Sequence, residues 1–266
     1  MLAHIIVDID PFIVRFPQSW GLDGIRWYGV CYIISFFLVQ YFLALYSRKK
    51  TSQLTPEQND SLLIYLALGI VIGGRLGYCL LYDFSNFIAN PLLVFQVWRG
   101  GMASHGGFLG GALAIVYFSK KFRCDIFSIG DIVCSIIPLC LLVGRLGNFI
   151  NAELVGRITT VPWGVIFARN VEYSLNVRHP SQLYEAFLEG FLLFIIGQIL
   201  IRRKNLRSGY LSGIFLVLYG VVRIVCECFR EPDAGLILNM TRGQFFSLFI
   251  ILFGAVLVKL RVTRLP

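Results

Sequence analysis

Long apolar segments dominate this sequence and limit what it can fold into. A helix that crosses a lipid bilayer needs about 20 mostly apolar residues. Seven segments approach or exceed that length, at residues 27–47, 61–82, 104–118, 130–150, 183–201, 209–229 and 243–260. The pattern predicts an all-α polytopic membrane protein with seven transmembrane helices and a small outward-facing loop region. We expect residues 1–266 to form a single integral membrane domain, with 152–182 as its longest outward-facing connection.

The composition favours this interpretation over its alternative, a large soluble protein with an unusually apolar core. Hydrophobic residues make up 57% of the chain and charged residues 15%, whereas soluble domains average about 45–50% and about 25%. The seven cysteines lie mostly in apolar runs and form no Cys-x-x-Cys pair, and the three histidines lack the spacing of metal ligands. We therefore expect no disulfide framework, no metal site and no cofactor.

The placement of lysine predicts the orientation of the chain. All six lysines fall in or beside the loops after the first, third, fifth and seventh segments. Because cytoplasmic loops are enriched in lysine and arginine, the N-terminus is expected outside and the C-terminus in the cytoplasm. The net charge of +9 is then a topology signal, and we expect membrane lipid rather than nucleic acid as the partner of these charges.

Three arginines lie inside apolar segments, namely Arg75, Arg145 and Arg223. Each follows the predicted cytoplasmic end of its segment by about 14 residues, or about 20 Å, which indicates the outer half of the bilayer. A charge at membrane depth costs about 2.5–3.5 kcal/mol on insertion scales, so each arginine needs a partner. Protein carboxylates or carbonyls would serve a structural role, whereas three arginines at one depth favour a site for a phosphate anion.

Tyr28 and His105 are expected at the same level, because their segments enter the bilayer from the outside. A tyrosine there can simply be an interfacial anchor. A lone histidine is often structural, but glycines at 106, 107, 110 and 111 leave room beside His105. We interpret His105 as a functional candidate and leave the anchor role of Tyr28 open.

The sixth segment contains Tyr219, Arg223 and Glu227 at intervals of four residues, which puts them on one helical face. An Arg223–Glu227 ion pair could offset its own burial, could hold the arginine toward a phosphate, or could do both.

The start of the fifth segment reads HPSQLYE from residue 179. Ser181 is a plausible N-cap of this helix. Glu185 and Glu189 are four residues apart on it. His179 is interpreted as a structural loop residue.

Taken together, these motifs resemble the prolipoprotein diacylglyceryl transferase family of bacterial membrane enzymes. The resemblance spans nearly the whole chain and is carried by RWYG at 26–29, GGRLGY at 73–78, HGG at 105–107, GRLGNFINAELVGR at 144–157, HPSQLYE at 179–185, YGVVRIVCECFREPD at 219–233 and GQ at 243–244. The element at 144–157 is the most specific of them.

The resemblance implies transfer of the diacylglyceryl group from phosphatidylglycerol to the lipobox cysteine of a prolipoprotein, the first step of bacterial lipoprotein modification. It implies that Arg145 and Arg223 bind the lipid headgroup. The other candidate residues that it implies are His105, Tyr28, Asn148, Glu153, Tyr219 and Glu227 for catalysis, and Gly156, Arg75 and Arg230 for substrate binding or support.

The implied chemistry is an alkyl transfer in which a thiolate displaces glycerol phosphate. A thiol with a pKa near 8.5 must lose its proton before it attacks. His105 is the natural candidate base, and Glu153 stays open as another. A transporter or lipid-binding receptor is the alternative function, because intramembrane charges also mark transport paths. The prediction of one common depth for the arginines favours the enzyme.

Overall fold

The computed structural model describes residues 4–20, 23–96, 100–170, 173–203, 205–232 and 235–261, apart from the side chains of Gln18, Ser104 and His105. Its contacts divide the chain into two compact units. One is Gln40–Gly130, here called the 40–130 unit; the other joins Met1–Val39 to Asp131–Pro266 and is called the discontinuous unit.

Six helical segments in the described part of the chain are long and apolar enough to cross a membrane: α1 (Trp27–Arg48), α2 (Pro56–Leu81), α5 (Ile126–Ile150), Ser181–Ile201, α8 (Tyr210–Glu227) and α9 (Arg242–Arg261). The third segment expected from the sequence, 104–118, lies within helix α4 (Ser104–Phe122), which is not among the six. The polytopic helical fold is confirmed, while the number seven is not.

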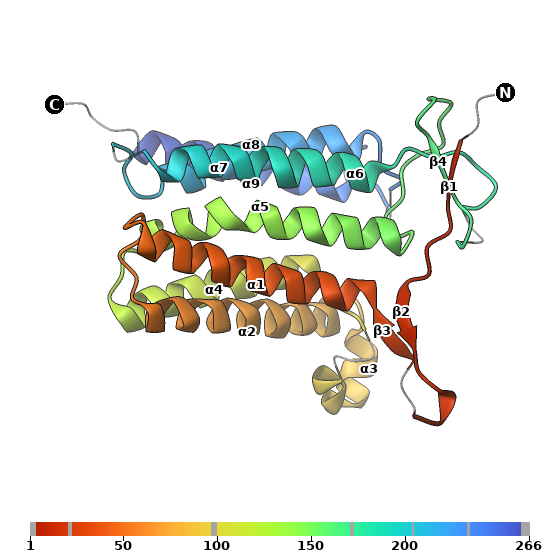
Figure 1. Cartoon of the computed structure of the whole chain (residues 1–266), viewed down its shortest axis with the longest axis horizontal. Helices are drawn as coiled ribbons and strands as arrows, with labels where there is room; N and C mark the ends of the chain where they lie inside the picture. Colours follow the sequence, from red (N-terminus) through yellow and green to blue (C-terminus); the bar gives the residue numbers. More distant parts are fainter. Residues whose placement is uncertain are drawn as a thin grey trace. The chain divides into compact units, whose positions relative to one another are not determined.

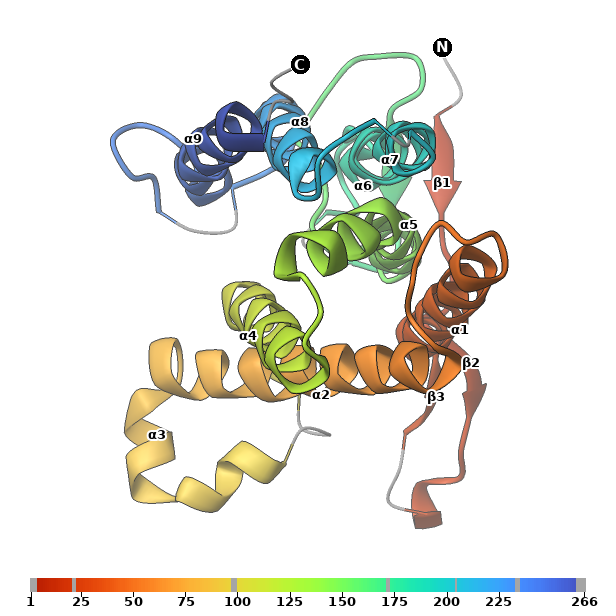
Figure 2. The ribbon, with the colours of Figure 1, turned by 90° about the vertical axis from the view of Figure 1, so that its left-hand side faces the viewer.

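In the 40–130 unit, α2 and α4 cross in close contact (Figure 2), and glycines lie where they meet. A Cβ atom added to Gly73 or Gly77 of α2 would press on the backbone of Gly106 or Gly110 of α4, and the reverse also holds. Such small residues let two helix backbones approach closely in lipid, where no hydrophobic force drives helices together. Two short elements, α3 (Phe84–Ala89) and η2 (Pro91–Phe95), lie in the connection between these helices.

The discontinuous unit is built around α5, α8, α9 and the segment Ser181–Ile201 (Figure 1). That segment consists of α6 (Ser181–Glu185), the π-helical turn η4 (Ala186–Leu192) and α7 (Leu193–Ile201). Gly190 lies directly against the backbone of Leu142 in α5. At the start of α8, the Asp131 carboxylate of α5 accepts hydrogen bonds of 2.7 Å from the backbone N–H groups of Gly209 and Ser212. This side chain thereby satisfies donors that a helix start leaves free.

Short strands accompany these helices in the discontinuous unit. β1 (Ile5–Val7) pairs in parallel with β4 (Val165–Phe167), and β2 (Phe12–Arg15) pairs antiparallel with β3 (Gly24–Arg26), with the 3₁₀ turn η1 (Gln18–Trp20) between them. Val7, Ala152, Val155, Val165 and Phe167 form a small buried core. This core fixes the chain that follows α5, which contains several of the candidate site residues.

Candidate active site

Two arginines and two glutamates form a closed ring of ion pairs in the discontinuous unit. Arg145 of α5 contacts Glu185 through Nε and Oε2 at 3.1 Å, and Glu189 through Nη2 and Oε2 at 3.1 Å. Arg223 of α8 contacts Glu185 Oε1 at 2.6 Å and Glu189 Oε1 at 3.1 Å, both through Nη1. Each carboxylate therefore bridges the two guanidinium groups, with one oxygen toward each.

Two further residues extend this ring into a six-residue group, which we call the ion-pair cluster. Glu227 contacts Arg223 Nη2 at 2.5 Å, which is the i, i+4 pair expected from the sequence. Arg230 Nη1 lies 3.6 Å from Glu185 and 3.8 Å from Glu227. The cluster contains three arginines and three glutamates, so its formal charges balance. Protein carboxylates are thus the observed partners of Arg145 and Arg223.

The two bridging carboxylates are fully buried, with 0% of either side chain exposed. Glu185 is the last residue of α6 and Glu189 lies in the π-helical turn, a type of turn that often occurs at functional sites. Removing one partner of a buried ion pair typically costs about 3–5 kcal/mol, because a charge is left unpaired. The sequence showed the helical spacing of Glu185 and Glu189 but gave them no role, because their partners lie on other helices, α5 and α8.

A strained turn follows the end of α5. Ala152 and Leu154 adopt φ angles of 52° and 54°, in the left-handed region that non-glycine residues seldom occupy. Between them, the Glu153 carboxylate accepts hydrogen bonds from the side-chain amides of Asn148 at 3.3 Å and Asn151 at 3.4 Å. The structure therefore brings the candidate residues Asn148 and Glu153 together, and strain of this kind gathers at functional sites.

The start of α6 fixes the same turn from the other side. Gln182 Nε2 donates to the Glu153 carbonyl at 2.6 Å, and Ser181 Oγ donates to the Leu154 carbonyl at 3.1 Å. The expectation that Ser181 is the N-cap is wrong: Pro180 precedes the helix and Ser181 is its first residue. The hydroxyl instead bonds the strained turn, whose position the sequence did not reveal.

The backbone of Gly156 contacts two other segments of the chain. Its N–H donates to the His179 carbonyl at 3.1 Å, and its carbonyl accepts from Arg178 Nη1 at 3.0 Å. Gly156 also forms an isolated bridge with Arg230, the arginine of the ion-pair cluster. A Cβ atom here would collide with the His179 carbonyl. The structure thus gives this candidate residue a close-approach role that only glycine can fill.

His179 lies just before the segment Ser181–Ile201, where it contacts other aromatic residues. Its Nδ1 lies 3.1 Å from the Tyr184 hydroxyl, which accepts a hydrogen bond of 2.7 Å from Trp163 Nε1. Desolvation by burial lowers the pKa of His179 from its ordinary value, which favours the neutral ring. These contacts agree with its interpretation as a structural loop residue.

The two candidate tyrosines also lie in the discontinuous unit. Tyr28 contacts Gly147 of α5, and its hydroxyl lies 3.4 Å from that of Tyr32. Tyr219 of α8 interacts electrostatically with Arg145 and Arg223, and its ring stacks on Phe215 with centroids 5.8 Å apart. Tyr219 is thus beside the ion-pair cluster.

Arg75 and His105 belong to the 40–130 unit. Arg75 is buried, and its guanidinium donates to the carbonyls of Leu93 at 2.5 Å, Val94 at 3.3 Å, Gly100 at 2.5 Å and Gly101 at 3.0 Å. These bonds organise its own loop, which favours the structural role left open by the sequence. The backbone of His105 lies in the first turn of α4, and its side chain lies outside the described part of the chain.

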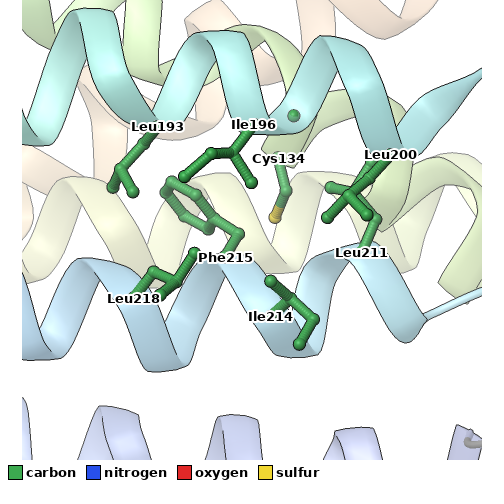
Figure 3. A pocket seen from close by; sticks show the side chains of 9 residues that line it. Cys134, Leu193, Ile196, Leu200, Leu211, Ile214, Phe215 and Leu218 are labelled. Atoms are coloured by element: carbon green, nitrogen blue, oxygen red, sulfur yellow. The ribbon is translucent and has the colours of Figure 1, made fainter.

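An apolar recess between α7 and α8 is a different kind of feature (Figure 3). Leu193, Ile196 and Leu200 line it from α7, and Leu211, Ile214 and Phe215 are among its lining from α8. Cys134 of α5 also lines it. The described residues that line it carry no ionic group to meet a headgroup, so the ion-pair cluster is the stronger candidate site.

Comparison with known proteins gives one consistent family. A family model described as prolipoprotein diacylglyceryl transferase matches residues 17–260. A phosphatidylglycerol–prolipoprotein diacylglyceryl transferase of Photobacterium profundum is 43% identical, covering 94% of this chain and 92% of its own length. One of Coxiella burnetii is 46% identical, with coverage of 92% and 93%. Another, of Idiomarina loihiensis, is 41% identical, with coverage of 97% and 95%.

Proposed function

The chain belongs to the prolipoprotein diacylglyceryl transferase family, and we propose that it moves the diacylglyceryl group of phosphatidylglycerol to a prolipoprotein. The acceptor is the lipobox cysteine thiol, and the products are a thioether and glycerol phosphate. The observation that carries this proposal is the ion-pair cluster, because its buried arginines supply the bidentate donors that a phosphate needs.

Arg145 and Arg223 bind the headgroup phosphate in this proposal. Both guanidinium groups are largely buried yet keep 14% and 13% of their side chains exposed, so an anion can reach them. Glu227 and Arg230 complete the cluster, and Tyr219 lies beside it. Arg75 and Gly156 act as supports: Arg75 bonds backbone carbonyls, and Gly156 bonds the His179 backbone and the Arg178 side chain.

The transfer step makes one bond and breaks another. The cysteine sulfur attacks the glyceryl carbon that carries the phosphate, a C–S bond forms, and the C–O bond to the phosphate breaks with its electron pair going to oxygen. Arginines stabilise the charge that develops on this oxygen. A base takes the thiol proton before the attack. His105 has the most suitable ordinary pKa for that task, and Glu153, held by Asn148 and Asn151, is the other candidate.

In the proposed membrane arrangement the chain is one integral domain of the bacterial inner membrane. Its N-terminus lies outside, its C-terminus lies in the cytoplasm, and the active site lies in the outer half of the bilayer. Residues 152–182 then face outward, where the lipobox segment of a prolipoprotein is presented. The lysine distribution and the common depth inferred for the intramembrane arginines support this arrangement.

The test is a transfer assay with purified protein, phosphatidylglycerol and a lipobox peptide. We expect the peptide to gain the mass of one diacylglyceryl group, and glycerol phosphate to appear in equal amount. A peptide with serine in place of the lipobox cysteine should gain nothing. Arg145→Ala should abolish transfer, and Arg145→Lys should restore little, because an ammonium cannot reproduce the planar fork. Full activity of Arg145→Ala would remove this arginine from the headgroup site.

A further inference from the structure

The geometry of the ring joining Arg145, Glu185, Arg223 and Glu189 is nearly symmetrical. The Oε2 atoms of both glutamates face Arg145 and their Oε1 atoms face Arg223, at distances of 2.6 to 3.1 Å. The arginines come from α5 and α8, and both glutamates come from the segment Ser181–Ile201. A single helical segment therefore sets the separation and orientation of two guanidinium groups carried by two other helices.

The ring leaves one edge of Arg145 unused. Arg223 directs Nη1 to Glu185 and Glu189 and Nη2 to Glu227. Arg145 donates a hydrogen bond through Nη2 and meets Glu185 through Nε as an ionic contact without hydrogen-bond geometry. Within the described ranges of the chain, Nη1 of Arg145 meets no acceptor. The Arg145 side chain keeps 14% of its surface exposed, so a ligand can approach this donor.

The chemistry of the transfer makes the charge of this ring important. The phosphatidylglycerol headgroup is a phosphate diester with one negative charge. Breaking its C–O bond gives a phosphate monoester, which carries about −1.5 to −2 charges at pH 7. Arginines that stabilise the departing oxygen therefore attract the product more strongly than the substrate. Two bare arginines in a low-dielectric site would release such a product slowly.

We propose that Glu185 and Glu189 are positioning residues that hold Arg145 and Arg223 and offset their charge, so that the glycerol phosphate product is bound weakly enough to leave. This inference rests on the proposed transfer function. The two fully buried carboxylates balance the two arginines of the ring, as Glu227 balances Arg230 in the rest of the cluster. The phosphate of substrate or product meets the Nη1 atom of Arg145, and the carboxylates limit the affinity of both arginines for it.

The test is the exchange of each glutamate for its amide, Glu189→Gln and Glu185→Gln. The amide keeps the size and an acceptor oxygen but removes one negative charge beside both arginines. Calorimetric titration of the detergent-purified protein with glycerol phosphate should show tighter binding, on the order of tenfold, for either variant. In the transfer assay, kcat and KM for phosphatidylglycerol should fall together, because the product leaves slowly. The matched control is Glu57→Gln, at an exposed acidic position at the start of α2. It should change neither the affinity for glycerol phosphate nor the two kinetic constants.

A merely structural role predicts the opposite sign. Loosening the ring would weaken glycerol phosphate binding along with turnover, and binding equal to or weaker than wild type in both amide variants would overturn the proposal. Should one variant fail to fold, the other carries the same test, because each glutamate contacts the same two arginines. The calorimetric measurement needs no turnover. A wild-type protein that binds glycerol phosphate but transfers nothing would therefore count against the proposed function and leave the test of the carboxylates intact.

Discussion

At the scale of single residues, Gly156 gives the sharpest prediction. A methyl group at this position would collide with the His179 carbonyl and side chain, and would separate the segment after α5 from the segment before α6. We expect Gly156→Ala to lose most transfer activity while the protein still inserts into the membrane, with about 1–3 kcal/mol lost from the local packing. Gly29→Ala is the control, because a Cβ at Gly29 meets nothing within 4 Å. A Gly156→Ala variant with wild-type transfer would show that this close approach is dispensable.

Individual residues also illustrate which contacts can be predicted from a sequence. The Arg223–Glu227 pair was predictable, because both residues lie on one helix at a spacing of four. The roles of Glu185 and Glu189 were not, although their spacing was visible, because their partners lie on α5 and α8. Arg75 carries the same Gly-Arg-Leu-Gly motif as Arg145, yet it bonds backbone carbonyls of a nearby loop. A motif of four residues does not specify its partners.

At the scale of elements, the glycines of α2 and α4 predict a difference between two neighbouring positions. A Cβ at Gly110 would run into the backbone of Gly69, whereas a Cβ at Gly111 would touch Ile70 at 3.4 Å, an ordinary contact. We expect Gly110→Ala to reduce the folded yield and the thermal unfolding temperature, and Gly111→Ala to leave both unchanged or slightly raised. Size-exclusion profiles and thermal unfolding in detergent measure the difference. Equal behaviour of the two variants would mean that α2 and α4 do not pack through this glycine face.

Helix positions followed from the sequence better than the details between them. The segment expected at 27–47 is α1, Trp27–Arg48, and the one expected at 209–229 is α8, Tyr210–Glu227. Apolar length alone predicts such helices. The pairing of β1 with β4 joins residues about 160 positions apart, and the π-helical turn at Ala186–Leu192 lies inside the apolar segment 183–201, which was expected to be one helix. Elements of this kind depend on tertiary contacts, so the residue pattern did not indicate them.

At the scale of the whole molecule, the distribution of lysine leads to a prediction about orientation. Lys49, Lys50, Lys120 and Lys121 follow the first and third predicted spans, while the loops at the opposite ends of the spans carry arginine but no lysine. Positively charged loops are retained on the cytoplasmic side during insertion. We therefore expect reporter domains fused after residue 50 or after residue 121 to be cytoplasmic, and one fused within 158–170 to be external. Alkaline phosphatase and green fluorescent protein fusions distinguish the two sides.

A charge-removal variant makes this prediction quantitative. Replacing Lys49, Lys50, Lys120 and Lys121 by glutamine removes four cytoplasmic charges without touching the ion-pair cluster. A mixed population of orientations should appear in the fusion assay, because the bias that selects one orientation is weakened. Transfer activity should fall in proportion to the inverted fraction, since only one orientation presents the site to an externally displayed lipobox. If the reporters instead find residues 49–50 outside in the wild-type protein, the arginines of the cluster would face the cytoplasmic leaflet, and an external acceptor cysteine could not reach them.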